Sequence, residues 1–204
     1  MVDNAAPVVE AQDVALTLDA SGNATLSTAQ AEVSSSDNCG IASKVLSKTA
    51  FDCSNVGTNP VTLTVTDVNG NVTTKTFNVT ITDNIAPTVL AKNLTVALDA
   101  NGQASVSIPQ VDNGSFDNCG LTLSLDKLNF DCSNVGVNTV TLTGTDPSGN
   151  SASATATVTV IDNIAPTALA NSFEVFLDTN GEAVISAEQV NNGSFDNCGI
   201  ASYT

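Results

Sequence analysis

The stretch Val-Thr-Leu-Thr-Val-Thr at residues 61–66 alternates apolar and threonine side chains. Alternation with a period of two, carried by β-branched residues, is typical of a β-strand with one buried face and one face in water. The same alternation returns at residues 77–81, 140–145 and 156–160. We therefore predict strands in these four places, with valine and leucine facing a core and threonine hydroxyls facing solvent.

Turn signals separate the alternating stretches. Glycine follows asparagine or serine in the turn-like segments 19–22, 68–71, 99–102, 147–150 and 178–181. Such pairs between apolar alternations are a strong hairpin signal. No apolar period of 3.6 residues holds for three turns, so we expect helix to be a minor component.

Residues 83–161 illustrate the strand order that we expect in each unit. Six or seven short strands in such a segment predict an all-β fold, an immunoglobulin-like β-sandwich. The chain has no tryptophan, so the core tryptophan of a true immunoglobulin domain is missing. The six strands are predicted near residues 87–91, 93–99, 103–108, 121–128, 138–145 and 151–161, with a short seventh beside them.

Short motifs recur along the chain at a fixed spacing. Asp-Asn-x-Ala-Pro opens at Asp3, Asp83 and Asp162, with offsets of 80 and 79 residues. A period of this length suits a small autonomous domain, so we predict tandem domains arranged as beads on a string. The third copy lacks a counterpart of 126–161, and we expect the natural polypeptide to continue past Thr204. The predicted domains are repeat 1 at 3–82, repeat 2 at 83–161 and an incomplete repeat 3 at 162–204.

Composition excludes several classes of function. The 204 residues include 21 acidic side chains, five lysines, no arginine and no histidine, and the net charge is −16. Without histidine, neither a Ser-His-Asp nor a Cys-His catalytic arrangement can form. Paired carboxylates could still hydrolyse glycosides, but the acidic residues mostly recur in turn-like contexts of each unit, so we predict that the chain is not an enzyme. The negative charge argues against nucleic acid and anionic membrane surfaces as partners. No apolar run in this sequence reaches the length of a membrane span.

The cysteines indicate a disulfide framework. Cys39 and Cys53 are separated by 14 residues, and Cys119 and Cys132 by 13. Pairing within each repeat gives every unit the same bridge, so we predict bridges Cys39–Cys53 and Cys119–Cys132 and leave Cys198 unpaired. Free buried thiols are the alternative, whereas a zinc site lacks the necessary ligand pattern. Disulfides in small repeated domains imply an oxidising, extracellular setting.

Three stretches of each repeat resemble a known extracellular family. They are an Asp-x-x-x-Pro opening, the segments 56–71 and 135–150, and the closing segments 79–83 and 158–162. These stretches resemble the hyalin-repeat (HYR) family of Ig-like modules, over essentially the whole chain. The Leu-Asp-Ala-x-Gly and Phe-Asp-Cys-Ser-Asn-Val-Gly motifs look like tandem repeats of large Bacteroidetes cell-surface adhesins, including the gliding-motility adhesin. The resemblance implies an adhesive or spacer role outside the cell, without enzymatic activity.

Recurring aspartates and asparagines are candidate calcium ligands. The loop at residues 67–71 is similar to the opening of an EF-hand loop, in which alternating oxygen ligands surround a hard cation. The junction at residues 82–87 looks like a cadherin linker, where calcium stiffens the joint between domains. The alternative is that these side chains only form turns through local hydrogen bonds. The candidate Ca²⁺ ligands are Asp67, Asn69, Asn71, Asp83, Asp146, Asn150 and Asp162.

We expect a structural and adhesive segment of a long secreted, cell-surface or filament-forming protein, rigidified by short linkers, disulfides and calcium. Its partners are then neighbouring repeats, other copies in a fibre, or surface polysaccharide. The alternative is a carbohydrate-binding accessory module of an extracellular protein. Exposed aromatic rings stack on sugars, and Phe116 and Phe195 are the candidates for such contacts. Asn-x-Ser/Thr sequons are further candidates for glycan attachment, at Asn23, Asn71, Asn78, Asn93, Asn113 and Asn192.

Overall fold

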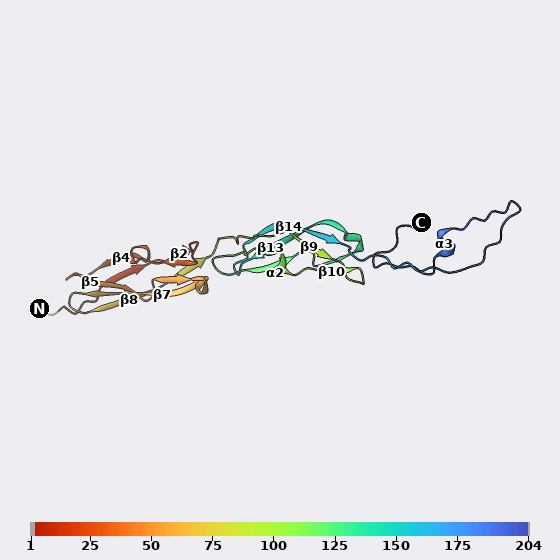
Figure 1. Ribbon diagram of the computed structural model, residues 1–204. Coiled ribbons are helices and arrows are strands. Elements are labelled where there is room, and N and C mark those ends of the chain that lie inside the picture. Colours follow the sequence, from red (N-terminus) through yellow and green to blue (C-terminus); the bar gives the residue numbers. More distant parts are fainter. Residues whose placement is uncertain (1–2, 204) are drawn as a thin grey trace. The chain divides into compact units, whose positions relative to one another are not determined.

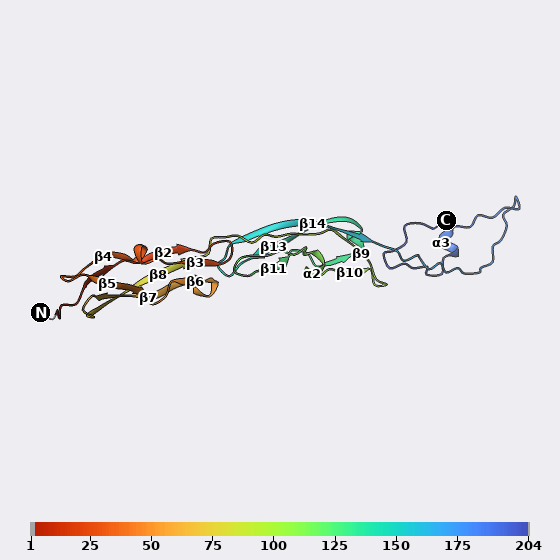
Figure 2. The ribbon, with the colours of Figure 1, turned by 60° about the vertical axis from the view of Figure 1, so that its left-hand side comes forward.

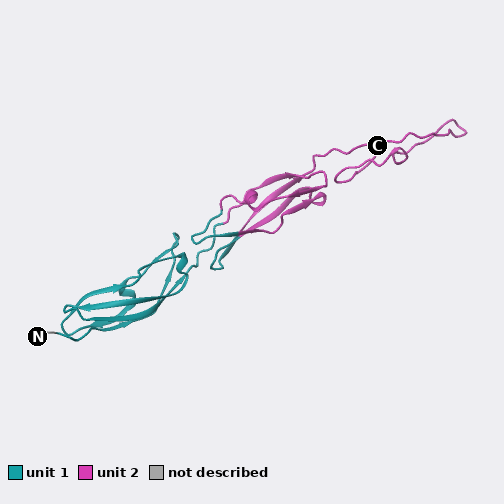
Figure 3. Ribbon diagram, turned by 90° about the horizontal axis from the view of Figure 1, so that it is seen from below, with its two compact units in different colours: residues 1–88, 115–122, 144–152 teal, residues 89–114, 123–143, 153–204 magenta. Residues whose placement is uncertain are grey.

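The computed structural model describes residues 3–203, which form β-strands and three helices of one turn each (Figure 1, Figure 2). The chain divides into two compact units, which Figure 3 colours separately. The first unit comprises the chain up to residue 88 together with 115–122 and 144–152. The second comprises 89–114, 123–143 and the chain from residue 153 onward. None of the helices within residues 3–203 is long and apolar enough to cross a membrane.

The first unit contains a four-stranded sheet in the order β2-β8-β7-β5. Strand β2 runs parallel to β8, and the other neighbours are antiparallel. Two smaller sheets pair β1 with β4 and β3 with β6. The strands are β1 (Val8–Ala11), β2 (Val14–Thr17), β3 (Asn23–Thr25), β4 (Glu32–Ser36), β5 (Ile41–Leu46), β6 (Ala50–Asp52), β7 (Gly57–Asp67) and β8 (Val72–Thr82), with helix α1 at Thr28–Ala31 and a 3-10 turn at Cys53–Asn55.

The alternating stretch at 61–66 lies in β7 and forms the centre of this core. Val61, Leu63 and Val65 are fully buried, as the period of two predicted. They share one apolar cluster with Phe51 of β6 and Leu26, which follows β3. The core therefore lies between the large sheet and the small ones, and the expected all-β sandwich is confirmed.

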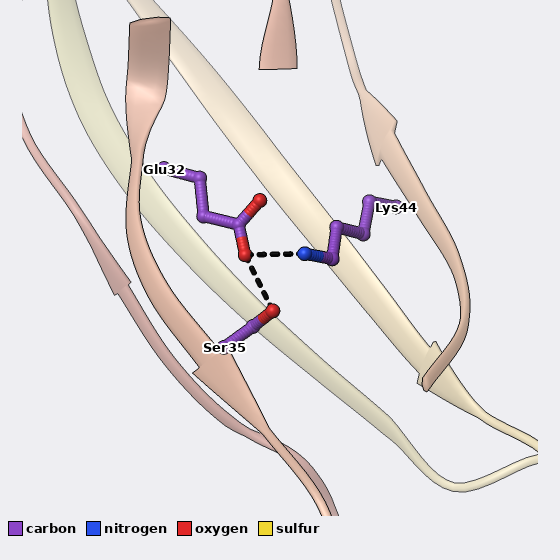
Figure 4. A network of polar contacts seen from close by, with 3 residues as sticks. All are labelled: Glu32, Ser35 and Lys44. Carbon is purple, nitrogen blue, oxygen red and sulfur yellow. Dashed lines mark hydrogen bonds and ion pairs between the residues drawn. The ribbon is translucent and has the colours of Figure 1, made fainter. Parts of the chain in front are cut away.

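An ion pair connects the two layers at one edge (Figure 4). Lys44 of β5 donates a hydrogen bond of 2.6 Å to Glu32 of β4, and the hydroxyl of Ser35 donates to the same carboxylate oxygen. The Lys44 hydrogen bond, followed by that of Ser35, lowers the pKa of the Glu32 carboxyl. The pair is partly exposed, so we assign it a modest contribution to stability.

The second unit repeats this plan, with a sheet in the order β11-β13-β14-β9. Strand β9 runs parallel to β14, and β10 pairs with β12. Val140, Leu142, Val158 and Val160 are fully buried between the layers. The elements are β9 (Leu94–Ala97), β10 (Gln103–Ser105), α2 (Ile108–Val111), β11 (Thr122–Leu125), β12 (Asn129–Asp131), a 3-10 turn at Cys132–Asn134, β13 (Gly136–Thr145), β14 (Ser151–Ile161) and α3 (Ala187–Val190).

Two local features of residues 83–161 differ from the strand predictions. In place of a strand at 87–91, the chain forms only the isolated bridges Thr88–Phe116 and Ala91–Asp112. The helix α2 begins after Ser107, whose side chain forms a capping box with Gln110. A Ser-x-x-Gln pattern is a known helix-start signal. It therefore marked this helix in the sequence, although one turn is too short to show an apolar period.

Residues 162–203 contain α3 and isolated bridges but no named strand. Leu18 and Leu98 are 3% and 4% exposed, whereas Leu177, one period later, is 67% exposed. Leu98 packs in the cluster that β13 and β14 build. Because residues 162–203 include no counterparts of these two strands, Leu177 has no apolar layer to cover it.

Candidate metal centre

Three aspartates from different segments of the first unit meet at one point. Asp83 follows β8, Asp117 lies in the loop before β11, and Asp146 follows β13. Each offers a carboxylate oxygen, and these oxygens lie within 4.8 Å of one another. Asp83 and Asp146 are each only 5% exposed. Negative charges this close and this buried repel one another, so the cluster favours a positively charged occupant.

Asn150 holds two of these groups in place. Its side-chain nitrogen donates to Asp146 Oδ2 at 2.7 Å and to the backbone oxygen of Asp83 at 3.0 Å. Its backbone N–H donates to Asp146 Oδ1 at 2.8 Å. Burial raises the pKa of the Asp146 carboxyl, but hydrogen bonds from the side chain and backbone of Asn150 and from the backbones of Gly149 and Ser148 outweigh burial and leave the pKa below its usual value. Asp146 is therefore ionised at neutral pH.

Several oxygens at this point have no hydrogen-bond donor. Asp83 Oδ2, Asp117 Oδ1 and Asn118 Oδ1 are buried and unpartnered. The other oxygen of Asp83 accepts from Ile85 N–H at 3.2 Å and from the Asn118 amide at 3.2 Å. A buried anionic oxygen without a partner is costly. Calcium prefers six to eight oxygen ligands, including carboxylates and amide carbonyls, so the donor set fits this ion.

The same constellation occurs one period earlier. Asp3, Asp37 and Asp67 form a second cluster with oxygens within 4.8 Å of one another. The Asn71 amide donates to Asp67 Oδ2 at 2.7 Å and to the backbone oxygen of Asp3 at 3.3 Å. Asp3 Oδ2 is again buried and unpartnered. Burial raises the pKa of Asp67, yet hydrogen bonds led by Asn71 hold it below its usual value.

The third copy is partial within the described residues. The Asn197 amide donates to Asp162 Oδ1 at 3.1 Å, which reproduces the contact between Asn118 and Asp83. Asp196 Oδ2 and Asn197 Oδ1 are buried and unpartnered. No counterpart of Asp146 occurs within residues 162–203, so this copy lacks the third carboxylate.

The aspartates that the sequence predicted as calcium ligands lie in different clusters. Asp67 lies in the first, Asp83 and Asp146 in the second, and Asp162 in the partial third. Asn71 and Asn150 donate amide N–H groups to the aspartates and so position them. Asn69 contributes its backbone N–H to Asp67 Oδ1 at 2.8 Å. Whether any of these residues binds calcium stays a prediction.

Sequence reasoning did not select Asp37 and Asp117 as ligands. Both belong to the Asp-Asn-Cys-Gly motif, which recurs in every copy, so the recurrence was the signal that could have identified them. Their backbones follow a local turn pattern, in which the aspartate accepts the N–H of the next cysteine. This pattern resembles an ordinary turn. Only the fold brings Asp37 and Asp117 close to the other two aspartates of their clusters.

The predicted disulfide pairing is wrong. The bridges are Cys53–Cys119 and Cys132–Cys198, each with Cα atoms 5.3 Å apart, so Cys198 is paired. Cys39 is the free cysteine of residues 3–203, and it is exposed. A bridge from each repeat to the following one recurs as regularly along the chain as a bridge within each repeat. The spacing argument therefore did not distinguish these two pairings.

The geometry of repeat 1 explains why Cys39 and Cys53 cannot pair. Cys39 precedes β5, a strand of six residues that spans about 20 Å. Cys53 lies at the opposite end, beside the turn that contains Gly22. This turn follows Leu18, whose N–H bonds to Thr82 at the end of β8. Disulfides require Cα atoms within about 7 Å, which these two positions do not approach.

Glycines make room for both bridges. A Cβ atom at Gly22 would lie 2.8 Å from Cys53 Sγ and 2.9 Å from the backbone oxygen of Asn118. A Cβ atom at Gly102 would lie 2.7 Å from Cys132 Sγ. Both glycines also have φ in the left-handed region, near +70°. The turn glycine is therefore required for close packing as well as for backbone conformation.

The two aromatic candidates for sugar contact are both accessible. Phe116 and Phe195 are each 60% exposed. Each pairs through its backbone with a threonine just after the Ala-Pro motif, Thr88 or Thr167. Glycan contact at these rings stays a prediction.

No protein-family model matches the chain. The chain is similar to hyalin. Hyalin of Strongylocentrotus purpuratus is 31% identical over 214 residues, which cover 98% of this chain and 18% of hyalin. The chain thus spans less than a fifth of the length of this curated relative.

Cadherin structures are also similar to the chain. Human Protocadherin-24 EC1-2 has a TM-score of 0.39 and 14% identity, covering 78% of this chain and all of that structure. Drosophila N-cadherin EC1-4 has a TM-score of 0.39 and 13% identity, covering 77% of this chain and 50% of that structure.

Proposed function

We propose that the chain is a structural and adhesive repeat segment of an extracellular protein, on a cell surface or in a filament, without enzymatic activity. The carrying observation is that each disulfide joins one sequence repeat to the next. Disulfides persist in oxidising, extracellular settings. The similarity to hyalin over 98% of the chain supports the same role. The finer resemblance to Bacteroidetes adhesins is supported by the sequence motifs.

The partners in this proposal are neighbouring repeats and other copies of the chain. Beads coated with the protein test this directly, because self-adhesion clusters the beads. We expect clustering in millimolar calcium and dispersal after a chelator is added. Beads that stay dispersed in both conditions contradict self-adhesion.

The second part of the proposal is that the acidic clusters bind Ca²⁺. Asp83, Asp117 and Asp146, with the Asn118 carbonyl beside them, supply oxygens for one ion. Asp3, Asp37 and Asp67 supply a second site. The support is the set of buried oxygens without donors at the points where three carboxylates converge.

Thermal melting of the full chain in calcium and in chelator tests this site. A ligand that binds only the folded state adds about 2.7 kcal/mol at a hundredfold excess over Kd, so the melting temperature should rise with calcium. In Asp83→Asn, we expect a smaller rise with calcium. In chelator, this variant should melt above the wild type, because one of three repelling charges is gone.

Glu10→Gln is the matched control, because it removes one carboxylate from an exposed position of β1. This variant should keep the full rise with calcium. A wild-type melting temperature that is equal in calcium and chelator would leave the aspartates as turn residues.

Carbohydrate binding is the second candidate function, because Phe116 and Phe195 expose their rings. A glycan array probed with the wild type and with the Phe116→Ala, Phe195→Ala double variant separates the two functions. Binding that depends on both rings favours the carbohydrate module, and an array without specific binding removes it.

A further inference from the structure

The two disulfides divide the chain into consecutive closed loops. Cys53–Cys119 and Cys132–Cys198 each close a loop with a sequence separation of 66. The loops do not overlap, and residues 119–132 connect them. A covalent route therefore exists through the protein that bypasses residues 54–118 and 133–197.

This route leaves out the long central strands of both cores, although it includes β6 and β12, whose Phe51 and Phe130 are buried. It follows the chain from β1 to β6, crosses the first bridge, continues along β11 and β12, and crosses the second bridge to Cys198. Strands β7 to β10 lie inside the first loop, and β13 and β14 inside the second. The buried strand pairs β7–β8 and β13–β14 are thus bypassed.

The acidic cluster around Asp83 also lies off the route. Asp83 and Asp117 belong to the first closed loop, and Asp146 belongs to the second. The segment that joins β8 to β9, which includes Pro87, is inside the first loop as well. Pulling on the two ends of the chain cannot stretch this segment while the Cys53–Cys119 bond is intact.

We propose a further function for these bridges: they carry tension from repeat to repeat and shield the residues inside each closed loop, 54–118 and 133–197, from extension. Tension as the natural load rests on the proposed structural role, whereas the covalent route itself rests on the bridges alone. At about 3.6 Å per extended residue, each closed loop withholds about 23 nm of contour length. In a tandem array, a repeat that is bridged at both ends exposes only a segment like 119–132 to the pull.

The surroundings of the bridges fit this role. Both bridges have the same environment, with all four cysteines half-buried. Cys53 Sγ lies 3.4 Å from the backbone oxygen of Asn118, and Cys132 Sγ lies 3.4 Å from that of Asn197. The close approach at Gly22 and Gly102 limits access to the sulfur atoms. The whole local arrangement therefore recurs at both bridges: the disulfide, the turn glycine beside it and the asparagine carbonyl next to the sulfur.

Single-molecule stretching of the full chain, held at its two ends, tests the proposal. We expect the fully extended oxidised protein to be about 46 nm shorter than the protein reduced with a phosphine. Reduction supplies two electrons and two protons per bridge and converts it to two thiols. The Cys53→Ser, Cys119→Ser double variant should recover one increment of about 23 nm without reductant.

Three results decide the matter. Equal extended lengths before and after reduction overturn the proposal. Increments of about 5 nm per bridge also overturn it, because they correspond to loops of the length 39–53. Increments of about 23 nm that are the same in calcium and in chelator support it. The calcium proposal is tested separately by melting, so either proposal can fail without the other.

Discussion

Removal of the Cys53–Cys119 bridge should lower the free energy of unfolding by more than the loss of the shorter Cys39–Cys53 loop that the sequence predicted. The perturbation is the Cys53→Ser, Cys119→Ser double variant. For a loop of 66 residues, the chain-entropy relation gives about 4.3 kcal/mol at room temperature. Small domains have only about 5–15 kcal/mol of stability in total, so this loss is a large fraction.

The assay is urea unfolding at neutral pH, followed by far-ultraviolet circular dichroism. With a slope of about 2 kcal/mol per molar urea, the midpoint of the transition that involves the first unit should fall by about 2 M. Cys39→Ser is the control. Its thiol is exposed and forms no disulfide, and a serine hydroxyl can keep the hydrogen bond that this thiol makes with Asp3, so its midpoint should stay at the wild-type value.

Two outcomes would refute the reasoning. A double variant as stable as the wild type would show that the bridge does not constrain the unfolded chain. A Cys39→Ser variant that loses as much stability as the double variant would restore the pairing of Cys39 with Cys53. Peptide mapping without reductant identifies the bonded cysteines independently.

Three further predictions follow from local packing. Gly22→Ala should lower stability or prevent the Cys53–Cys119 bridge from closing, because the added Cβ would meet the sulfur and the backbone. Gly181→Ala, with a similar φ of +81° and nothing within 4 Å of its Cβ, should cost much less stability. Thermal melting and free-thiol titration compare the two variants. The pKa of the Asp131 carboxyl lies below its usual value, chiefly because the Ser133 hydroxyl donates to it. A lowered folded-state pKa stabilises above about pH 4 and the effect is lost as pH falls further, so Ser133→Ala should lower the urea midpoint at neutral pH and much less in acid. Leu142→Ala, at a fully buried position, should cost about 2–5 kcal/mol in urea unfolding, and a cost below 1 kcal/mol would contradict the assigned core.

The sequence by itself determined the elements that depend on near neighbours. The alternation of Val61, Leu63 and Val65 with threonine predicted a strand, its buried face and its place in a β-sandwich. The fixed period predicted that the same unit returns. These inferences hold because strand period and turn chemistry are set by adjacent residues.

Only the tertiary structure decided which repeated groups meet. The two complete copies carry equivalent cysteines and aspartates, so a pairing within one copy and a pairing between copies have the same local sequence. Cys39 lies at one end of β5, which is about 20 Å long, and Cys53 lies at the opposite end of the layer. The Cα atoms of Cys53 and Cys119, in contrast, are 5.3 Å apart. Likewise, Asp83 joins Asp117 and Asp146 because strand register brings their three segments to one point. Distance between groups far apart in sequence is a property of the packed sheets, and no pattern of neighbouring residues encodes it.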